Sequence, residues 1–298
     1  MEAVMQIIAY GVVVGALYGL VAVGLALLLG VARFLNIAHG TFIMIGGYVS
    51  YWLFTLWHVD PFASVPLVML VMFLIGLILY KALFSPLSKF PEGLKINNSM
   101  LVTFGLIWVL DNVGILLWTS DMRRVTPSYF GATFEILGVT LPFVGLGVIG
   151  LALLVVFALH LLLTKTYFGK SVRATAQDWE AATLMGINID RTYLISCAIG
   201  VALAGVAGVA VALMYTITPC GGLAWLLIAL IVLVLAGLGN INGIFVAGVI
   251  LGLVEAVSVF VVGAPYRAAV TLAIFCLLYT SDAADEGLGV DLGGRRII

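Results

Sequence analysis

The chain's most constraining feature is a series of long apolar stretches, each near the roughly 20 residues that a helix needs to cross a bilayer. They lie at about residues 9–32, 41–57, 63–83, 100–118, 141–163, 193–215, 223–238 and 244–262, and a ninth begins near 265 and stops early. We therefore expect an all-α, polytopic membrane protein with about eight transmembrane helices and a truncated last one. The second and seventh stretches are short, so their limits and their full crossing stay open.

The composition excludes most other classes. Of the 298 residues, 64% are hydrophobic and 9% are charged, whereas soluble domains are about 45–50% apolar and about 25% charged. Soluble enzymes, secreted disulfide scaffolds and disordered chains are therefore excluded. The apolar runs do not alternate as barrel strands do. A net charge of −1 provides no basic surface for nucleic acid. The three cysteines and three histidines lack metal-binding spacing, so we expect no metal and no cofactor bound by this chain.

The positions of lysine and arginine predict the orientation, because these residues are enriched in cytoplasmic loops. If the loop between the fifth and sixth stretches is cytoplasmic, eight basic residues fall on that side and three on the other. The cytoplasmic set is Arg33, Lys81, Lys89, Lys95, Lys165, Lys170, Arg173 and Arg191, and the external set is Arg123, Arg124 and Arg267. The asymmetry places the N-terminus outside the cell.

Glycines recur at intervals of four residues in the first stretch, in the last complete stretch and just before the latter. Small residues at this interval lie on one helix face and let two helices approach closely in lipid. The set is Gly11, Gly15 and Gly19, then Gly239 and Gly243, then Gly248 and Gly252. We interpret them as helix-packing positions, in preference to a pore lining.

Several polar residues lie within or between the apolar stretches. Charged groups at membrane depth are costly and usually face a cavity or a partner. Glu255 and Asp111 are of this kind, and either a structural contact or a place on a translocation path accounts for them. Asn36, His39 and Gly40 interrupt the apolar pattern between the first two stretches. They form either a cytoplasmic turn or an unwound segment of the kind that frames transporter sites.

The loop at 164–191 is long, polar and basic, whereas the other loops are short. It predicts a two-turn amphipathic helix on the cytoplasmic surface, capped at both ends. The expected parts are an N-cap at Asp178, an acidic first turn at Glu180, an apolar face of Ala181, Leu184 and Met185, and a terminating Gly186. Such a face either docks a partner or lies on the membrane surface or on the chain's own spans.

The last 23 residues, 276–298, differ from the rest in composition, with six charged residues. The string CLLYTSDAADE (276–286) resembles one reading frame of a sequencing-library adapter, and VDLGGRRII (290–298) resembles the primer that follows it. We expect a non-native tail that belongs to no domain. The transmembrane domain then spans 1–275.

Glu180-Ala181-Ala182, followed after three residues by Gly186, resembles the EAA loop of permeases in ATP-binding-cassette (ABC) importers. RATAQDWEAATLMGINIDR (173–191), which begins at Arg173, resembles the LivH-type branched-chain amino acid permeases. So do the segments 16–51 and 235–256. The resemblance implies that the loop fits an ATPase subunit and that the chain pairs with a second, related permease subunit. It also implies an extracytoplasmic solute-binding protein that delivers the substrate.

The expected function is therefore that of a bacterial inner-membrane permease subunit for branched-chain or other hydrophobic amino acids. It would not be an enzyme, since ATP would bind two cytoplasmic ATPase subunits. Gly169-Lys170-Ser171 is not a phosphate-binding loop, because Thr164 occupies the position of the required glycine. Two alternatives stay open. One is a urea or amide permease of the same family, and the other is an ion-coupled secondary transporter that uses Glu255 or Asp111.

Overall fold

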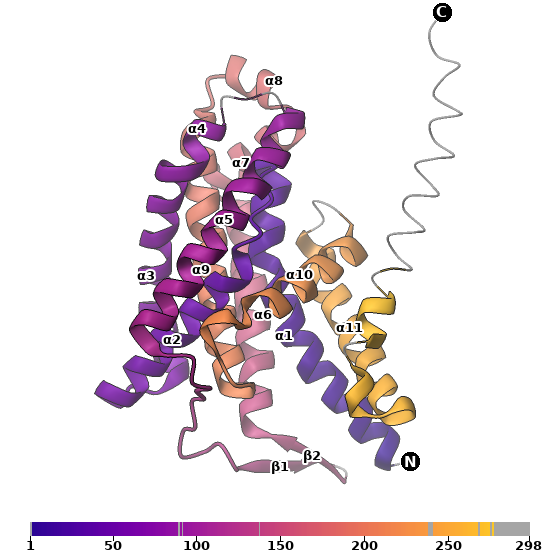
Figure 1. Cartoon of the computed structure of the whole chain (residues 1–298). Helices are drawn as coiled ribbons and strands as arrows, with labels where there is room; N and C mark the ends of the chain where they lie inside the picture. Colours follow the sequence, from indigo (N-terminus) through magenta and orange to yellow (C-terminus); the bar gives the residue numbers. More distant parts are fainter. Residues whose placement is uncertain are drawn as a thin grey trace, which may run out of the picture.

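The computed structural model describes residues 2–88, 90, 92–136, 138–237, 241–267, 269–274 and 276. Within them the chain is a helical bundle (Figure 1). The helices are α1 (Glu2–Ala32), α2 (His39–Trp57), α3 (Pro61–Leu79), α4 (Ser85–Leu87), α5 (Glu92–Trp118), α6 (Phe143–Lys165), α7 (Tyr167–Gln177), α8 (Trp179–Leu184), α9 (Ile189–Met214), α10 (Gly222–Ala236) and α11 (Ile241–Val262). A π-helical turn, η1 (Tyr80–Phe84), joins α3 to α4, and two 3-10 turns are η2 (Pro219–Gly221) and η3 (Ala264–Tyr266).

Seven helical segments in the described part are long and apolar enough to cross a membrane, which confirms the polytopic all-α class. They lie in α1, in α3 through α4, and in α5, α6, α9, α10 with η2, and α11. The predicted count of eight differs by one, because the second stretch, which forms α2, is not among these segments. Its 19 residues include His39, Thr41 and Ser50, all of which are buried inside the bundle. Neighbouring helices, not lipid, therefore surround much of α2.

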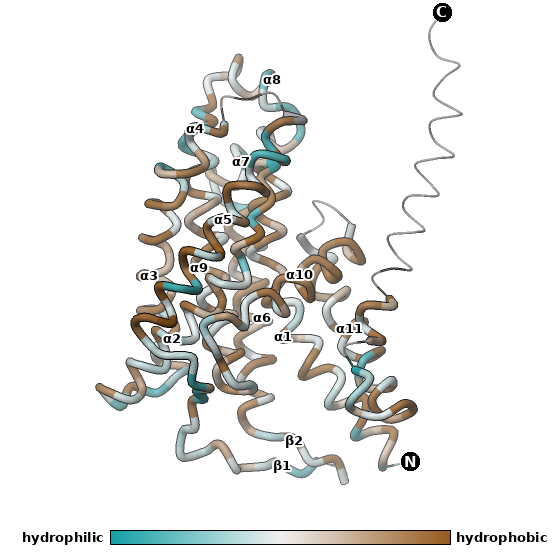
Figure 2. The backbone as a smooth tube through the Cα atoms, in the orientation of Figure 1, coloured by the Kyte–Doolittle hydropathy of each residue, from teal (hydrophilic) through white to brown (hydrophobic). Residues whose placement is uncertain are grey.

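Helices α1 and α9 form the centre of the bundle. Most residues of both are buried, whereas α3, α5 and α6 expose large apolar side chains along much of their length. Helix α9 packs against α1, α2 and α3, and α1 also packs along α11. The apolar side chains on the outer helices form the surface that lipid would cover. Figure 2 shows hydrophilic residues gathered around α7 and α8 at one end.

The glycines of α1 and α11 pack against each other. A Cβ added to Gly15 would stand 2.5 Å from the Cα of Val249, and one added to Gly252 would stand 2.4 Å from the backbone oxygen of Gly11. Gly248 meets Gly19 with equal closeness. The two backbones are therefore in contact along one line, and no side chain larger than hydrogen fits there.

Two further glycines were predicted as packing positions. Gly243 lies in the first turn of α11, and Gly239 lies outside the described residues.

A second line of glycine contacts surrounds α9, and the sequence pattern did not identify it. A Cβ on Gly46 of α2 would stand 2.5 Å from the Cα of Gly205, and one on Gly208 would stand 2.1 Å from the backbone oxygen of Ile43. On the α1 side, Gly24 lies equally close to Gly200. Residue spacing reveals that a helix has a small-residue face, but not which helix covers it.

A short antiparallel hairpin precedes α6. Strands β1 (Thr133–Ile136) and β2 (Val139–Pro142) pair in register, and Gln6 of α1 exchanges two hydrogen bonds with the Thr140 backbone, at 2.7 and 2.9 Å. The all-α prediction did not include this element. The hairpin and the N-terminus lie at one end of the bundle, and α8 lies at the other (Figure 1). Apart from Cys276, the predicted tail (276–298) lies outside the described residues.

Candidate coupling surface and translocation path

The short helix predicted in the loop 164–191 is present as α8, and its first turn is capped by a side chain. The Asp178 carboxylate accepts hydrogen bonds from the backbone N–H groups of Glu180 and Ala181, at 2.9 and 3.0 Å. Glu180 lies in the first turn, where the helix dipole favours a negative charge. A helix this short has little intrinsic stability. The Asp178 cap therefore contributes a large share of the stability of α8.

The C-terminal end of α8 closes in a Schellman motif. The Gly186 N–H donates to the Thr183 carbonyl at 3.0 Å, and the Ile187 N–H donates to the Ala182 carbonyl at 3.1 Å. This geometry requires a left-handed residue between them, and Gly186 has φ +82°. The glycine ends the helix as the sequence predicts.

Helix α7 fixes the position of α8 relative to the bundle. Thr166 caps α7 by accepting from the Gly169 N–H at 3.0 Å. A Cβ on Gly169 would stand 2.2 Å from the Leu163 carbonyl oxygen, so α7 turns back tightly against the end of α6. Arg173, predicted as part of the coupling region, donates to the same Leu163 carbonyl. The Lys95 ammonium of α5 lies 5.1 Å from the ring centre of Trp179 in α8.

The outer surface of α8 carries large apolar side chains. Leu184 is 88% exposed, Met185 is 83% exposed, and Tyr167 of α7 is similarly open. Ala181 is exposed beside them, whereas Ala182 faces inward and is buried. No residue in the described part of the chain covers this surface.

A groove lies on each side of α8. One, of about 340 Å³, includes Lys95 and Asp190, and the other, of about 400 Å³, includes Tyr167 and Met185. Knob-like apolar side chains between two grooves form a surface suited to a folded partner.

The segment between α1 and α2 is unwound inside the bundle. The His39 Nε2–H at the start of α2 donates to the Val21 carbonyl at 3.0 Å. The start of α2 therefore lies beside the interior of α1, well before the end of α1 at Ala32. Two hydroxyls of α5 satisfy backbone N–H groups in this segment. Ser99 accepts from Leu35, and Thr103 accepts from Ile37, each at 3.1 Å. Irregular backbone at membrane depth is tolerated where protein supplies such partners.

The residues near this segment that were predicted to line a translocation path have different surroundings. Asn36 is fully buried; its Oδ1 accepts from the Ala38 N–H at 3.1 Å, and its Nδ2 has no partner among the described residues. A Cβ on Gly40 would stand 1.9 Å from the Gly222 carbonyl oxygen, so the N-terminal ends of α2 and α10 meet here. Neither of these positions lines either groove beside α8.

Asp111 of α5 lies close to the same meeting point. It is half-buried and accepts a long hydrogen bond, 3.4 Å, from the Thr41 hydroxyl of α2. The structure thus brings Asp111 near Gly40 through Thr41, but not near Glu255, which lies in another cluster.

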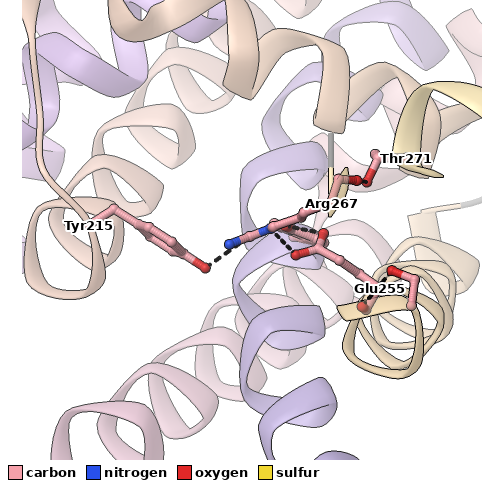
Figure 3. Close-up of polar contacts among 6 residues, drawn as sticks. Tyr215, Glu255, Arg267 and Thr271 are labelled. Atoms are coloured by element: carbon pink, nitrogen blue, oxygen red, sulfur yellow. Dashed lines mark hydrogen bonds and ion pairs between the residues drawn. The ribbon is translucent and has the colours of Figure 1, made fainter. Parts of the chain in front are cut away.

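Glu255 of α11 forms an ion pair with Arg267, which follows η3 (Figure 3). Glu255 is only 4% exposed, and the Arg267 side chain is 31% exposed. The Tyr18 hydroxyl of α1 donates to Glu255 Oε2 at 2.5 Å and accepts from Arg267 Nη2 at 2.7 Å. Arg267 Nη2 also donates to the Tyr215 hydroxyl at 3.1 Å. Three segments distant in sequence therefore meet at one charged pair.

A cavity of about 520 Å³ opens beside this cluster. Its polar wall contains Glu255, Arg267, Tyr18 and Tyr215, and its apolar wall comes mainly from α10, with Trp225, Leu227, Ile228 and Ile231. Burial raises the pKa of the Tyr215 phenol to about 12, so its hydroxyl keeps its proton at neutral pH. The volume is in the range of small-molecule sites.

The sequence singled out Glu255, but Tyr18, Tyr215 and Arg267 were not predicted as site residues. Arg267 was predicted as an external-loop cation, and the structure pairs it with Glu255 of α11. The available signal was a membrane-depth carboxylate followed, across the short turn VVGAPYR, by an arginine. A buried carboxylate needs such a partner, since an uncompensated charge there is costly.

Comparison with known proteins decides the family. The model of the family described as "Branched-chain amino acid transport system / permease component" matches residues 7–279, almost the whole chain. The chain belongs to this permease family. The match also ends within the segment predicted as a non-native tail from Cys276 onward.

Individual relatives also match most of the chain. The branched-chain amino acid permease BraD of Pseudomonas aeruginosa is 28% identical over 92% of both chains. LivH of Salmonella typhimurium is 29% identical over 90% of both, and the probable LivH of Methanocaldococcus jannaschii is 29% identical over 81% of this chain and 76% of its own. No solved structure matches this permease significantly. The relatives are transport components rather than enzymes, and this chain is a multi-pass membrane permease like them.

Proposed function

We propose that the chain is the permease subunit of an ATP-driven importer for branched-chain amino acids in the bacterial inner membrane, with its N-terminus outside. Two cytoplasmic ATPase subunits, a second related permease subunit and an extracytoplasmic binding protein would complete it. The chain itself would hold no cofactor, since ATP would bind the ATPase subunits. The names of its relatives support the substrate class.

The observation that carries the proposal is helix α8. It is capped at both ends, it lies at the end of the bundle away from the N-terminus, and Leu184 and Met185 project from it uncovered by any described residue. Two grooves flank it. This is the geometry expected of an element that inserts into a cleft of an ATPase subunit.

Motion of α8 would be transmitted to the centre of the bundle. Helix α8 ends at Leu184 and α9 begins at Ile189, with Asn188 capping α9 by accepting from the Arg191 N–H at 2.9 Å. Helix α9 in turn packs against α1, α2 and α3. Because a capped helix moves as a rigid unit, ATP-driven closure of the ATPases would tilt α9 and its neighbours. Such a tilt is the conformational change that alternating access requires.

The ion pair of Glu255 favours this mechanism over ion-coupled transport. Arg267 already compensates the Glu255 charge, and Tyr18 holds one carboxylate oxygen. A proton carrier would have to leave both partners in each cycle. The exposed α8 surface would also have no purpose in a transporter without an ATPase.

Reconstitution into proteoliposomes tests the proposal. The complete complex should take up leucine when ATP is supplied on the α8 side, and a proton gradient alone should give no uptake. Excess isoleucine or valine should compete, and urea or acetamide should not. Uptake driven by the gradient without ATP would contradict the proposal. Competition by urea, without competition by valine, would assign the chain to amide transport instead.

A further inference from the structure

The charged pair beside the 520 Å³ cavity retains unused hydrogen-bonding capacity. Arg267 uses Nε for Glu255 and Nη2 for the two tyrosines, and its Nη1 donates no hydrogen bond within the described chain. The Tyr215 hydroxyl accepts from Arg267, but its own proton reaches no acceptor there. Two donors on one wall of a cavity therefore lack acceptors.

These two donors are arranged for a carboxylate. An arginine and a neutral phenol on the same wall donate to the two oxygens of one carboxylate group, and charge-assisted bonds of this kind are among the strongest in proteins. The Trp225 ring meets the Tyr215 ring edge-on, with 5.3 Å between centres, and so restricts where the hydroxyl can lie. Tyr18 similarly fixes Glu255. The polar wall is therefore preorganised rather than mobile.

The same cavity offers places for the other two parts of an aliphatic amino acid. Glu255 is the carboxylate on its polar wall, and an ammonium group is its natural second partner. The facing wall consists of Leu227, Ile228 and Ile231 from α10, with Leu272 beside them. A zwitterion can bridge the pair because each of its charges meets the opposite one, so the site stays neutral overall.

The position of the cavity suits a transport site. Tyr18 lies midway along α1, and Tyr215 follows the end of α9 that is remote from α8. The cavity is therefore in the half of the bundle away from the coupling surface, which is where an importer receives its substrate. Sites near the middle of the membrane, at the junction of interrupted helices, are common in transporters.

We infer that Arg267, Tyr215 and Glu255 form a binding site for a zwitterionic α-amino acid with an aliphatic side chain. The substrate carboxylate binds Arg267 and Tyr215, its ammonium binds Glu255, and its side chain contacts Ile228 and its neighbours on α10. This inference rests on the proposed function, and it assigns the substrate to residues that the sequence alone did not bring together.

Saturation-transfer NMR tests the site by measuring how leucine binds to the complete complex in detergent. Leucine should bind, whereas 4-methylpentanoate, which lacks the ammonium, and 3-methylbutylamine, which lacks the carboxylate, should bind at least about tenfold more weakly. Arg267→Gln should weaken leucine by a similar factor. Arg124→Gln is the matched control, because Arg124 donates to the Met214 carbonyl at the same end of the bundle but does not line the cavity. Equal binding of leucine and both analogues would overturn the inference.

A charge swap separates a binding role from a structural one. Glu255→Arg combined with Arg267→Glu keeps an ion pair, so it should restore the folded complex if the single variants unfold it. It should not restore leucine binding, because the reversed charges turn the substrate side chain away from α10. Full recovery of leucine binding would show that the pair is structural only.

A third variant leaves the ion pair untouched. Ile228→Phe narrows the apolar wall, so it should reduce leucine binding at least about fivefold more than alanine binding. An equal effect on both amino acids would count against the site.

Uptake measurements distinguish a failure of the inferred binding site from a failure of the proposed function. If that complex imports leucine with ATP and Arg267→Gln imports it with unchanged KM and rate, the site is wrong and the proposed function stands. If the wild-type complex imports no amino acid, the proposed function itself fails.

Discussion

The Gly248 carbonyl oxygen lies 2.8 Å from the point where a Cβ on Gly15 would stand, so α1 and α11 touch through their backbones. Gly15→Val should therefore force the helices apart and lower the stability of the folded bundle by about 1–3 kcal/mol. Thermal unfolding in detergent measures the change. Gly150→Val is the matched control, since nothing lies within 4 Å of a Cβ at Gly150 of α6. Equal losses of stability for both variants would show that the close approach of α1 and α11 does not restrict the side chain at position 15.

The Asp178 cap predicts a second outcome. Asp178→Ala removes the acceptor for two N–H groups of α8 and should cost about 1 kcal/mol of local helix stability. Asp178→Asn keeps an acceptor and should behave almost as the wild type. Hydrogen exchange of the α8 amides reports the difference directly, and the recovery of ATPase subunits on purification reports its consequence. Identical exchange in the two variants would contradict the role of the cap.

Substitutions at Gly186 should act through backbone conformation rather than through side-chain chemistry. Because its φ is +82°, Gly186→Ala should strain the end of α8 by roughly 1 kcal/mol, and Gly186→Val should strain it more. Gly186→Asn should be tolerated best, since asparagine adopts left-handed conformations readily. ATPase-coupled uptake should follow the order Gly, Asn, Ala, Val. A variant series that ignores this order would show that the Schellman closure is dispensable.

The exposed apolar surface of α8 predicts how the complex is held together. Leu184→Glu places a charge where an apolar contact is expected, and it should reduce co-purification of the ATPase subunits at least about tenfold. Met122→Glu introduces the same charge at another highly exposed apolar position, 77% exposed, outside the coupling surface. That control should purify with its full set of subunits. Loss of ATPase from both variants would indicate a general defect instead.

Features that depend on nearby residues could be predicted from the sequence. Asp178, Glu180 and Gly186 specify the two ends of α8 through hydrogen bonds that span at most a few residues, so their pattern is readable without a fold. The C-terminal limits of the long apolar helices follow in the same way from hydropathy, whereas α1 and α5 begin at Glu2 and Glu92, well before their apolar stretches at 9–32 and 100–118. The second stretch differs from the others in another way: it forms α2 but is not among the seven candidate spans, and its polar residues are covered by other helices rather than by lipid.

Features that depend on tertiary pairing could not be predicted. The glycine spacing of α1 and α11 indicated that each helix has a narrow face, but neither spacing names its partner. Arg267 shows the same limit more sharply. Charge bias places an arginine outside the membrane on average, and only the fold brings this arginine back to Glu255 and Tyr18. Sequence identified one member of the charged cluster and missed the other three.

The most direct test of the account measures leucine uptake and ATP hydrolysis together in proteoliposomes that contain the complete complex. Glu180→Lys reverses the charge in the first turn of α8, where a negative charge is favoured, and leaves the cavity unaltered. The account predicts that the number of leucine molecules imported per ATP falls at least about tenfold while hydrolysis continues. An unchanged ratio of uptake to hydrolysis would contradict the claim that α8 couples this permease to its ATPases.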